Sequence, residues 1–267
     1  MTIVPPGKTA IKRLSGLSAE LAREAGGVLK QGFNRRLSIV YKGRIDPVTQ
    51  FDLKAEKLIT SRIRKLYPDH AILAEEGTAV DSLSPYRWVI DPLDGTVNYA
   101  HGFPMYCVSI AVEYEEQAVA AAVFDPERNE MFTAAVGLGS FLDSRKIHVS
   151  SESRLDRSLL ATGFSYKVST ERRNNLGLFA RMVKKAQGVR RPGSAALDLC
   201  WLACGRIDGF WELNLHPWDT AAARLIVEQA GGRVTRLNAR PFSIFDKDIL
   251  ASNGRIHRAM QKVLTAK

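Results

Sequence analysis

The first part of the chain carries an apolar stripe with a helical period. Apolar residues recur every three or four positions among basic ones, at Ile11, Leu14, Leu17, Leu21, Ala25 and Val28. Gly32 and the cluster Asn34-Arg35-Arg36 come directly after this stripe. The spacing predicts a long amphipathic helix that ends near residue 32.

Four more helices are expected further along the chain. One follows Thr49 and ends before Pro68. Its apolar positions are Leu53, Leu58, Ile59, Ile63 and Leu66. A basic helix is expected over residues 170–187, another begins after Gly193, and the last spans residues 219–230, where glycines supply the usual stop.

Short runs of apolar and β-branched residues predict strands. These runs lie at residues 37–41, 71–74, 87–90, 107–113, 118–125, 130–135 and 159–162. The middle runs follow one another across glycine-containing turns and predict an antiparallel section, whereas strands and helices alternate later. We therefore expect a mixed α+β fold with helices layered on sheets.

A polar stretch at residues 149–157 predicts a subdomain boundary. It separates an N-terminal α+β subdomain, residues 1–149, from a C-terminal α/β subdomain, residues 150–267. A length of 267 residues is enough for one large domain or two closely packed subdomains. The hydrophobic fraction of 45% and the charged fraction of 25% are ordinary for a soluble globular protein.

Cysteine usage and hydropathy favour a cytoplasmic protein without a membrane partner. No apolar run approaches the roughly 18 to 20 residues of a membrane helix, and residues 1–6 do not resemble a secretory signal. Three cysteines, Cys107, Cys200 and Cys204, are too few for a disulfide framework. Buried thiols in a reducing compartment are the simpler interpretation, and a zinc site is the alternative.

The formal net charge of +10 favours anionic partners. Much of the excess lies in residues 8–36 and 172–191. Phosphorylated substrates, nucleic acid and acidic proteins all fit such a charge. A solvated basic face that aids solubility fits it equally well.

The strongest chemical signal is the run Trp88-Val89-Ile90-Asp91-Pro92-Leu93-Asp94-Gly95-Thr96. A buried strand here delivers two carboxylates, three positions apart, into a tight turn, and Thr96 is placed to begin a helix. Two such carboxylates can face one cation, while turn N–H groups hold an anion beside it. The alternative is ordinary turn chemistry for aspartate and glycine.

Three more acidic stretches occupy strand ends or helix starts. Glu75 and Glu76 follow the strand at 71–74 and could be a solvated pair. Asp52 lies three residues after Thr49, which is also the spacing of a capping box. Asp219 opens a helix and could be a plain N-cap. Together the four stretches suggest one shared site.

Electrostatics predict cations at such a site. Unit charges about 4 Å apart repel by roughly 4 kcal/mol at intermediate dielectric, so five converging carboxylates need divalent ions between them. The motifs offer oxygen ligands and no histidine, which favours Mg²⁺ over zinc.

These motifs, in this order, resemble those of the inositol monophosphatase family, in particular its bacterial branch. The central motif is Asp91-Pro92-Leu93-Asp94-Gly95-Thr96-Val97-Asn98-Tyr99. The other matching segments are Asp46-Pro47-Val48-Thr49-Gln50-Phe51-Asp52, Ala74-Glu75-Glu76-Gly77, Arg190-Arg191-Pro192-Gly193-Ser194-Ala195-Ala196-Leu197-Asp198-Leu199, Trp218-Asp219-Thr220-Ala221-Ala222-Ala223 and Glu228-Gln229-Ala230-Gly231-Gly232. The resemblance covers nearly the whole chain as far as Gly232. Val97 stands where the family often has a second threonine, and Pro47 where an apolar residue is common.

The resemblance implies two to three Mg²⁺ ions per site. The implied metal ligands are Glu75, Asp91, the carbonyl of Leu93, Asp94 and Asp219. Asp52 and Thr96 would orient the attacking water, with Glu75 as a further catalytic residue. The N-terminal subdomain would then carry most metal ligands.

The substrate contacts implied by the resemblance are Asp94, Gly95, Thr96, Ala195, Glu212 and Asp219. The family also implies a layered α-β-α-β-α sandwich of the fructose-1,6-bisphosphatase type, a homodimer, and inhibition by lithium. Water activated by metal would attack phosphorus directly, without a phospho-enzyme.

Glu212 favours inositol 1-phosphate as substrate, with related polyol and sugar phosphates accepted, because the implied role of its carboxylate is to bind ring hydroxyls. Fructose 1,6-bisphosphate, histidinol phosphate, NADP and 3′-phosphoadenosine 5′-phosphate are alternatives on the same scaffold. A different alternative is binding of RNA or a transcription complex through the basic helix at 170–187, in addition to catalysis. That segment lacks interleaved aromatic residues and any known nucleic-acid motif.

Overall fold

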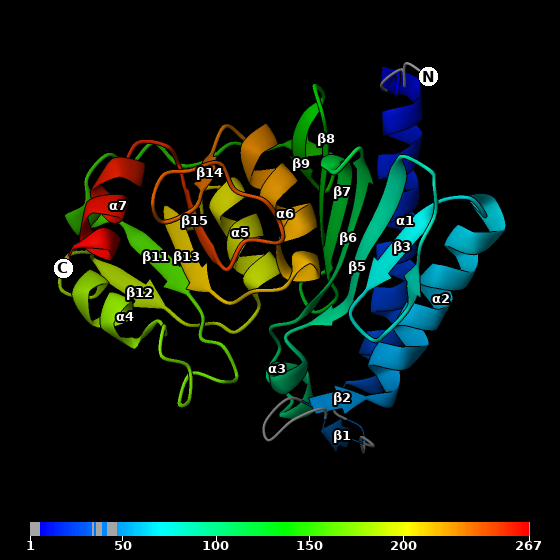
Figure 1. Cartoon of the computed structure of the whole chain (residues 1–267), viewed down its shortest axis with the longest axis horizontal. Coiled ribbons are helices and arrows are strands. Elements are labelled where there is room, and N and C mark those ends of the chain that lie inside the picture. Colours follow the sequence, from blue (N-terminus) through cyan, green and yellow to red (C-terminus); the bar gives the residue numbers. More distant parts are fainter. Residues whose placement is uncertain (1–5, 34, 36–38, 42–46, 267) are drawn as a thin grey trace.

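The computed structural model describes residues 6–33, 35, 39–41 and 47–266. Five layers succeed one another, helix, sheet, helix, sheet, helix (Figure 1). The predicted α-β-α-β-α fold class is therefore confirmed. Asp46 and residues 34, 36–38 and 42–45 lie outside the described part.

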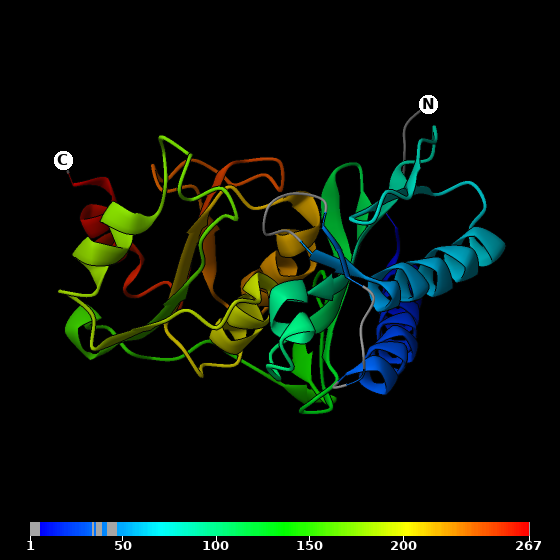
Figure 2. The same ribbon diagram turned by 90° about the horizontal axis from the view of Figure 1, so that it is seen from below.

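The first outer layer consists of α1 (Lys8–Gly32) and α2 (Gln50–Leu66). Both helices cover one face of an eight-stranded sheet, where the stripe predicted for α1 packs on the central strands (Figure 2). The sheet order is β10 (Arg145–Lys146), β9 (Gly139–Leu142), β8 (Glu130–Ala135), β7 (Gln117–Asp125), β6 (Cys107–Tyr114), β5 (Tyr86–Asp94), β3 (Ala71–Ala74) and β4 (Ala79–Val80). Among the described strands of this sheet, only β3 and β5 pair in parallel, so the predicted antiparallel section is confirmed.

The middle layer consists of α5 (Ala195–Ala203) and α6 (Pro217–Gln229), which lie between the two sheets. A helix that is apolar on nearly every face is suited to full burial, and α5 is of this kind. The three consecutive alanines of α6, residues 221–223, are fully buried and allow close approach to the large sheet. Each large apolar side chain buried here contributes roughly 1.5–3 kcal/mol to folding.

The second sheet and its outer helices complete the sandwich. The sheet order is β12 (Gly188–Arg190), β11 (Leu159–Thr162), β13 (Gly209–Leu213), β15 (Asp248–Ser252) and β14 (Arg233–Thr235). Its outer face carries α4 (Leu176–Met182) and α7 (His257–Thr265), which also contact each other. Three small elements remain: the antiparallel pair β1 (Ile39–Tyr41) and β2 (Pro47–Thr49), helix α3 (Thr96–Ala100), and a 3-10 turn at Leu155–Arg157. No helix in the described ranges is both long and apolar enough to span a bilayer.

The division at residues 149 and 150 stays a proposal. One hydrophobic core crosses it, because side chains of β5, β6 and β7 pack with those of α5 and α6 in a single cluster.

The prediction of a basic helix over residues 170–187 is wrong. Only Leu176–Met182 is helical, and residues 170–175 form a turn end, bends and irregular backbone. Asn175 is the reason: its amide donates to Thr162 Oγ1 at 2.7 Å and to the Gly163 carbonyl at 2.6 Å, and its Oδ1 accepts from Trp211 Nε1 at 2.7 Å. These long-range bonds hold the preceding segment against the second sheet.

Three smaller predictions also need correction. In α2, Leu53 and Leu66 are exposed, while Asp52 and Glu56 are buried, where their carboxylates accept from the N–H groups of Thr49 and Glu76. The strand predicted at 87–90 continues to Asp94. Of the three cysteines, which are free thiols, Cys204 is only partly buried.

His257 gives the fold a pH dependence. Its ring is buried at the start of α7, with Nε2 2.9 Å from Thr235 Oγ1 and Nδ1 2.9 Å from Ser252 Oγ. Burial, and secondarily the charge of Arg233, lowers the pKa of His257 to about 4. The unfolded chain takes up this proton near pH 6.5 and the folded chain does so only near pH 4.

Acidification from pH 7 to pH 4.5 should therefore reduce the free energy of unfolding, with roughly 2–3 kcal/mol coming from His257. Urea denaturation of the wild type and of His257→Gln at both pH values measures this, because only the wild type carries the contribution. His101→Gln, at an exposed position, serves as the matched control. Equal pH slopes in the wild type and His257→Gln would contradict the assignment.

Candidate active site

The central carboxylates come from the end of β5, where the strand bulges. Asp91 pairs with Ser109 of β6 and Asp94 with Cys107, so three steps on β5 oppose two on β6. A bulge re-aims the side chains that flank it. The Leu93 N–H donates to Asp91 Oδ1 at 2.9 Å, which fixes that carboxylate inside the bulge.

Gly95 links this strand to α3 and has a left-handed backbone with φ of 96°. A Cβ at this position would lie 2.8 Å from the Met105 carbonyl oxygen, so both the conformation and the space require glycine. Thr96 then begins α3, as predicted.

Glu75 is brought beside Asp91 by the parallel pairing of β3 and β5. Ala74 pairs with Ile90, and the Glu75 N–H donates to the Ile90 carbonyl at 3.2 Å. The turn that carries Glu75 is held from α2 by Glu56, which accepts from the Glu76 N–H at 2.7 Å and from Thr78 Oγ1 at 2.7 Å.

Asp52 combines the two roles that the sequence left open. As the third residue of α2 it caps the helix, because its Oδ2 accepts from the Thr49 N–H at 3.0 Å and from the Thr49 hydroxyl. Its Oδ1 lies 3.4 Å from Thr96 Oγ1, which also donates to the Leu93 carbonyl at 3.0 Å. Asp52 is buried and does not line the cleft, so Thr96 is its connection to it.

Asp94 and Asp219 face the first turns of the two middle helices. Asp94 Oδ2 accepts from Ser194 Oγ at 2.7 Å and from the Ala196 N–H at 2.8 Å, at the start of α5. Asp219 Oδ2 accepts from the His216 N–H at 2.7 Å. Asp219 is therefore the third residue of α6, not its N-cap, because Pro217 already begins that helix.

The pKa values show that these carboxylates share one electrostatic environment. Burial raises the pKa of Asp91 well above its usual range, and the charges of Glu75, Asp94 and Asp219 raise it further. Burial likewise raises the pKa of Asp219, and Asp94 adds to the effect. The pKa of Asp94 is raised by burial against the lowering effect of Ser194 and the α5 N–H groups.

All these segments line one cleft with a volume of about 870 Å³. The predicted residues that line it are Glu75, Asp91, Leu93, Asp94, Gly95, Thr96, Ala195, Glu212 and Asp219. Asp52 is the exception. Within the described ranges, however, no three His, Cys, Asp or Glu side chains are arranged as a group that could hold a metal ion. Asp94 and Asp219 instead direct an oxygen toward backbone N–H groups.

The substrate side of the cleft is built around Glu212 on β13. Its carboxylate lies directly over Gly163, where a Cβ would overlap both carboxylate oxygens. Burial raises the pKa of Glu212 to about 8, although the nearby charge of Arg191 opposes the shift. The α5 N–H group of Ala195 is directed at Asp94 and helps to lower its pKa.

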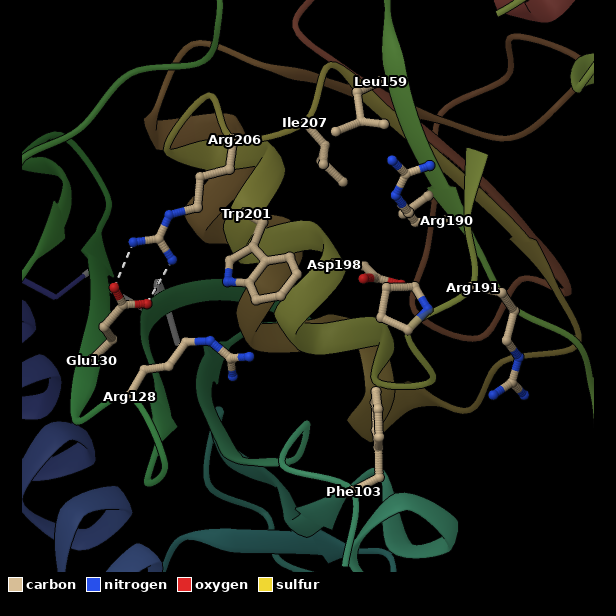
Figure 3. Close-up of a pocket in the computed structure, with 12 residues that line it drawn as sticks. Phe103, Arg128, Glu130, Leu159, Arg190, Arg191, Asp198, Trp201, Arg206 and Ile207 are labelled. Atoms are coloured by element: carbon tan, nitrogen blue, oxygen red, sulfur yellow. Dashed lines mark hydrogen bonds and ion pairs between the residues drawn. The ribbon is translucent and has the colours of Figure 1, made fainter. Parts of the chain in front are cut away.

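A second hollow of about 660 Å³ lies on the other side of α5 (Figure 3). Trp201 and Phe103 supply its apolar surface, and Arg206 forms an ion pair with Glu130 at its edge. Arg191 and Asp198 line both this hollow and the carboxylate cleft.

Several residues that shape the cleft were missed by the sequence analysis. They are Glu56, Gly163, Ser194 and Asp198. Ser194 precedes a helix and signals only a cap, which it also provides by accepting from the Leu197 N–H. Glu56 and Gly163 act through partners that are distant in sequence, and Asp198 lies inside a helix, so no local pattern marks them.

Comparison with known proteins identifies the family. The model of the inositol monophosphatase family matches residues 12–267. The inositol-1-monophosphatase of Synechocystis sp. is 42% identical over 252 residues, which cover 94% of this chain and 88% of that protein. The Nus factor SuhB of Xylella fastidiosa is 39% identical over 258 residues, or 94% of each chain. The structure of an inositol monophosphatase from Anabaena (Nostoc) sp. PCC 7120 superposes with a TM-score of 0.87 at 40% identity, covering 95% of this chain and 96% of that one.

The chain belongs to the inositol monophosphatase family. The predicted family is thereby confirmed, and the expectation that the protein is an inositol-phosphate phosphatase agrees with the family and with the names of the Synechocystis and Anabaena relatives. The assignments of individual site residues remain predictions.

Gly163→Ala should displace the Glu212 carboxylate and leave the fold intact, because the overlap falls on the flexible end of that side chain. A misplacement of about 1 Å can cost up to roughly a hundredfold in rate, so kcat/KM for a polyol phosphate should fall about ten- to a hundredfold. Steady-state phosphate release measures this effect. Gly177→Ala is the matched control, since a Cβ there meets nothing within 4 Å. Equal activity of the two variants would show that Glu212 does not bind substrate.

Proposed function

We propose that the protein is a Mg²⁺-dependent phosphomonoesterase that hydrolyses inositol 1-phosphate and related polyol or sugar phosphates. One observation carries this proposal: carboxylates from three of the four acidic stretches line the same cleft, where the charges of Glu75, Asp94 and Asp219 act together on Asp91. Membership of the family supports it independently.

The donor set fits Mg²⁺. The ligands we propose are the carboxylates of Glu75, Asp91, Asp94 and Asp219 and the carbonyl of Leu93, all oxygen donors of the kind Mg²⁺ prefers. Buried carboxylates that repel one another favour a nearby cation, and two to three ions would offset their charge. Bound Mg²⁺ supplies positive charge that polarises a water and the ester oxygen that leaves.

The chain's own groups bind and orient the phosphate. Gly95 and Thr96 lie at the start of α3, where backbone N–H groups without helical partners can donate to phosphate oxygens. Thr96 Oγ1 can accept from the attacking water while its own proton passes toward Asp52 Oδ1, 3.4 Å away. The Thr49 N–H holds Asp52 in place for this step.

Substrate hydroxyls are assigned to Glu212, Ala195, Asp94 and Asp219. Glu212 stands where the second sheet meets the cleft, and its buried carboxyl needs hydrogen-bond partners of the kind that a polyol ring offers. We therefore propose inositol 1-phosphate as the preferred substrate. Fructose 1,6-bisphosphate, histidinol phosphate, NADP and 3′-phosphoadenosine 5′-phosphate are the alternatives.

A panel of these esters, assayed with and without Mg²⁺, tests the proposal. We expect the highest kcat/KM for inositol 1-phosphate and no turnover after chelation. A higher kcat/KM for histidinol phosphate or the adenosine bisphosphate than for inositol 1-phosphate would overturn the proposed substrate. Full turnover in the presence of a chelator would overturn the proposed metal requirement.

We also propose a cytoplasmic homodimer that pairs across the hollow of Figure 3. Phe103 there is 53% exposed, and a second copy of the chain would cover this side chain. Sedimentation of the wild type and of Phe103→Asp tests this, and a monomeric wild type would exclude it.

RNA or transcription-complex binding is the second candidate role. The name Nus factor, carried by the Xylella relative, and the positive net charge support it. The basic segment at 170–187 supports it less, because only seven of its residues are helical. Filter binding of RNA over a salt series tests the role, and loss of binding near physiological salt would remove it.

Asp94→Asn should abolish turnover, with kcat reduced more than about a hundredfold, while the protein stays folded. The asparagine side-chain oxygen can still accept from Ser194 Oγ and the Ala196 N–H. It lacks the negative charge that we propose binds the metal, and its neutrality removes the repulsion between this position and Asp91. Phosphate release and circular dichroism measure the two effects. Asp156→Asn, at an exposed position, is the control. Activity near wild type at saturating Mg²⁺ would contradict the role of Asp94.

Lithium at millimolar concentration should inhibit turnover, as the resemblance implies. The assay is phosphate release from inositol 1-phosphate in sodium-free buffer, with equal potassium as the control. An unchanged rate in lithium would remove this expectation.

A further inference from the structure

Helix α2 supports the proposed active site at two points. Asp52 and Glu56 lie four positions apart on this helix and are only 1% and 4% exposed. Residues at this spacing share one face of a helix and stand about 6 Å apart along its axis. Asp52 reaches Thr96, and Glu56 reaches the turn that carries Glu75. One face of α2 therefore contacts two separate parts of the site.

The carboxylate of Glu56 binds the turn with both of its oxygens. Oε2 accepts from the Glu76 N–H at 2.7 Å, and Oε1 accepts from the Thr78 N–H at 3.1 Å and from Thr78 Oγ1 at 2.7 Å. Throughout the described part of the chain, no basic residue forms an ion pair with Glu56. Hydrogen bonds to a charged carboxylate are stronger than those between neutral groups. The turn is therefore the partner that makes burial of this carboxylate tolerable.

Strand β5 holds the same turn through its backbone. The Glu75 N–H donates to the carbonyl of Ile90, the residue before Asp91, at 3.2 Å. The Ala74 N–H donates to the Thr78 carbonyl at 3.0 Å and closes the turn. The backbone of Glu75 is thus fixed by both α2 and β5, and Glu75 lines the cleft together with Asp91.

Metal ligands depend on the hydrogen-bonding groups that support them, and loss of such a group typically costs about 10- to 100-fold in metal affinity. The support of Asp91 comes from its own strand, where the Leu93 N–H donates to Oδ1 at 2.9 Å. The support of Glu75 comes from its turn, to which Glu56 contributes three hydrogen bonds. A shift of this turn would therefore move the Glu75 carboxylate relative to Asp91.

We propose that Glu56 is a positioning residue that sets the Mg²⁺ affinity of the cleft by fixing the turn of Glu75, with the Thr78 hydroxyl as its side-chain partner. This inference rests on the proposed phosphatase function of the same cleft. Glu56 acts on the backbone of the turn, so its effect on the metal passes through the position of Glu75. Because Asp52 lies on the same face, α2 fixes the separation between the metal ligand Glu75 and the residues that orient water.

Calorimetric titration of the full chain with MgCl₂ measures the metal affinity directly. Glu56→Gln places an amide NH₂ where the turn needs an acceptor, so the dissociation constant for Mg²⁺ should rise about tenfold or more. Thr78→Val removes one donor and keeps both backbone bonds, so a rise of about three- to tenfold is expected. Thr78→Ser retains the hydroxyl and should bind within about twofold of the wild type. In each variant kcat at saturating Mg²⁺ should change less than the affinity, because a high metal concentration compensates for weaker binding.

Thr60→Val is the matched structural control. The buried Thr60 hydroxyl donates to the Glu56 carbonyl within α2 at 2.8 Å, so this variant should lose stability and keep the wild-type dissociation constant. An unchanged dissociation constant in both Glu56→Gln and Thr78→Val, or an equal loss of affinity in Thr60→Val, would overturn the positioning role and leave the phosphatase function standing. If Glu56→Gln does not fold, Thr78→Val decides. A wild type that neither binds Mg²⁺ nor hydrolyses inositol 1-phosphate would refute the proposed function and the role of Glu56 with it.

Discussion

The structure depends on keeping several carboxylates close together in a buried place. Their charges repel and burial opposes ionisation, which is why the pKa values of Asp91, Asp94 and Asp219 are all raised. Two features make the arrangement tolerable. Backbone N–H groups of the middle helices donate to Asp94 and Asp219, and a large apolar core on both sides of those helices supplies the stability that the repulsion takes away.

The cleft lies where both sheets of the sandwich contribute residues. Glu75, Asp91 and Asp94 come from strand ends of the eight-stranded sheet, and loops of the five-stranded sheet supply another part of the lining. Arg191 and Asp198 stand at the border between this cleft and the hollow of Figure 3. A change at the hollow can therefore reach the cleft through two side chains that belong to both.

The sequence was sufficient wherever the signal was local. The period of α1, the capping box of Asp52 and the glycine before α3 are each set by neighbours within a few positions. It was insufficient wherever a partner lay far away. Asn175, directly before α4, bonds to the second sheet, so the helix begins later than composition suggests, and Glu56 holds a turn some 20 residues distant. The resemblance singled out nine residues that the structure places in one cleft. The hydrogen bonds from helix N–H groups to Asp94 and Asp219 could not be predicted from the sequence motifs.

The tie between Asp94 and α5 limits what this carboxylate can offer. Oδ2 accepts from Ser194 and Ala196, both about one hundred positions further along the chain. The direction of this carboxylate is therefore decided by the other half of the molecule. In a chimaera that joins the N-terminal half of one relative to the C-terminal half of another, the orientation of Asp94 would therefore depend on how well the two halves pack together.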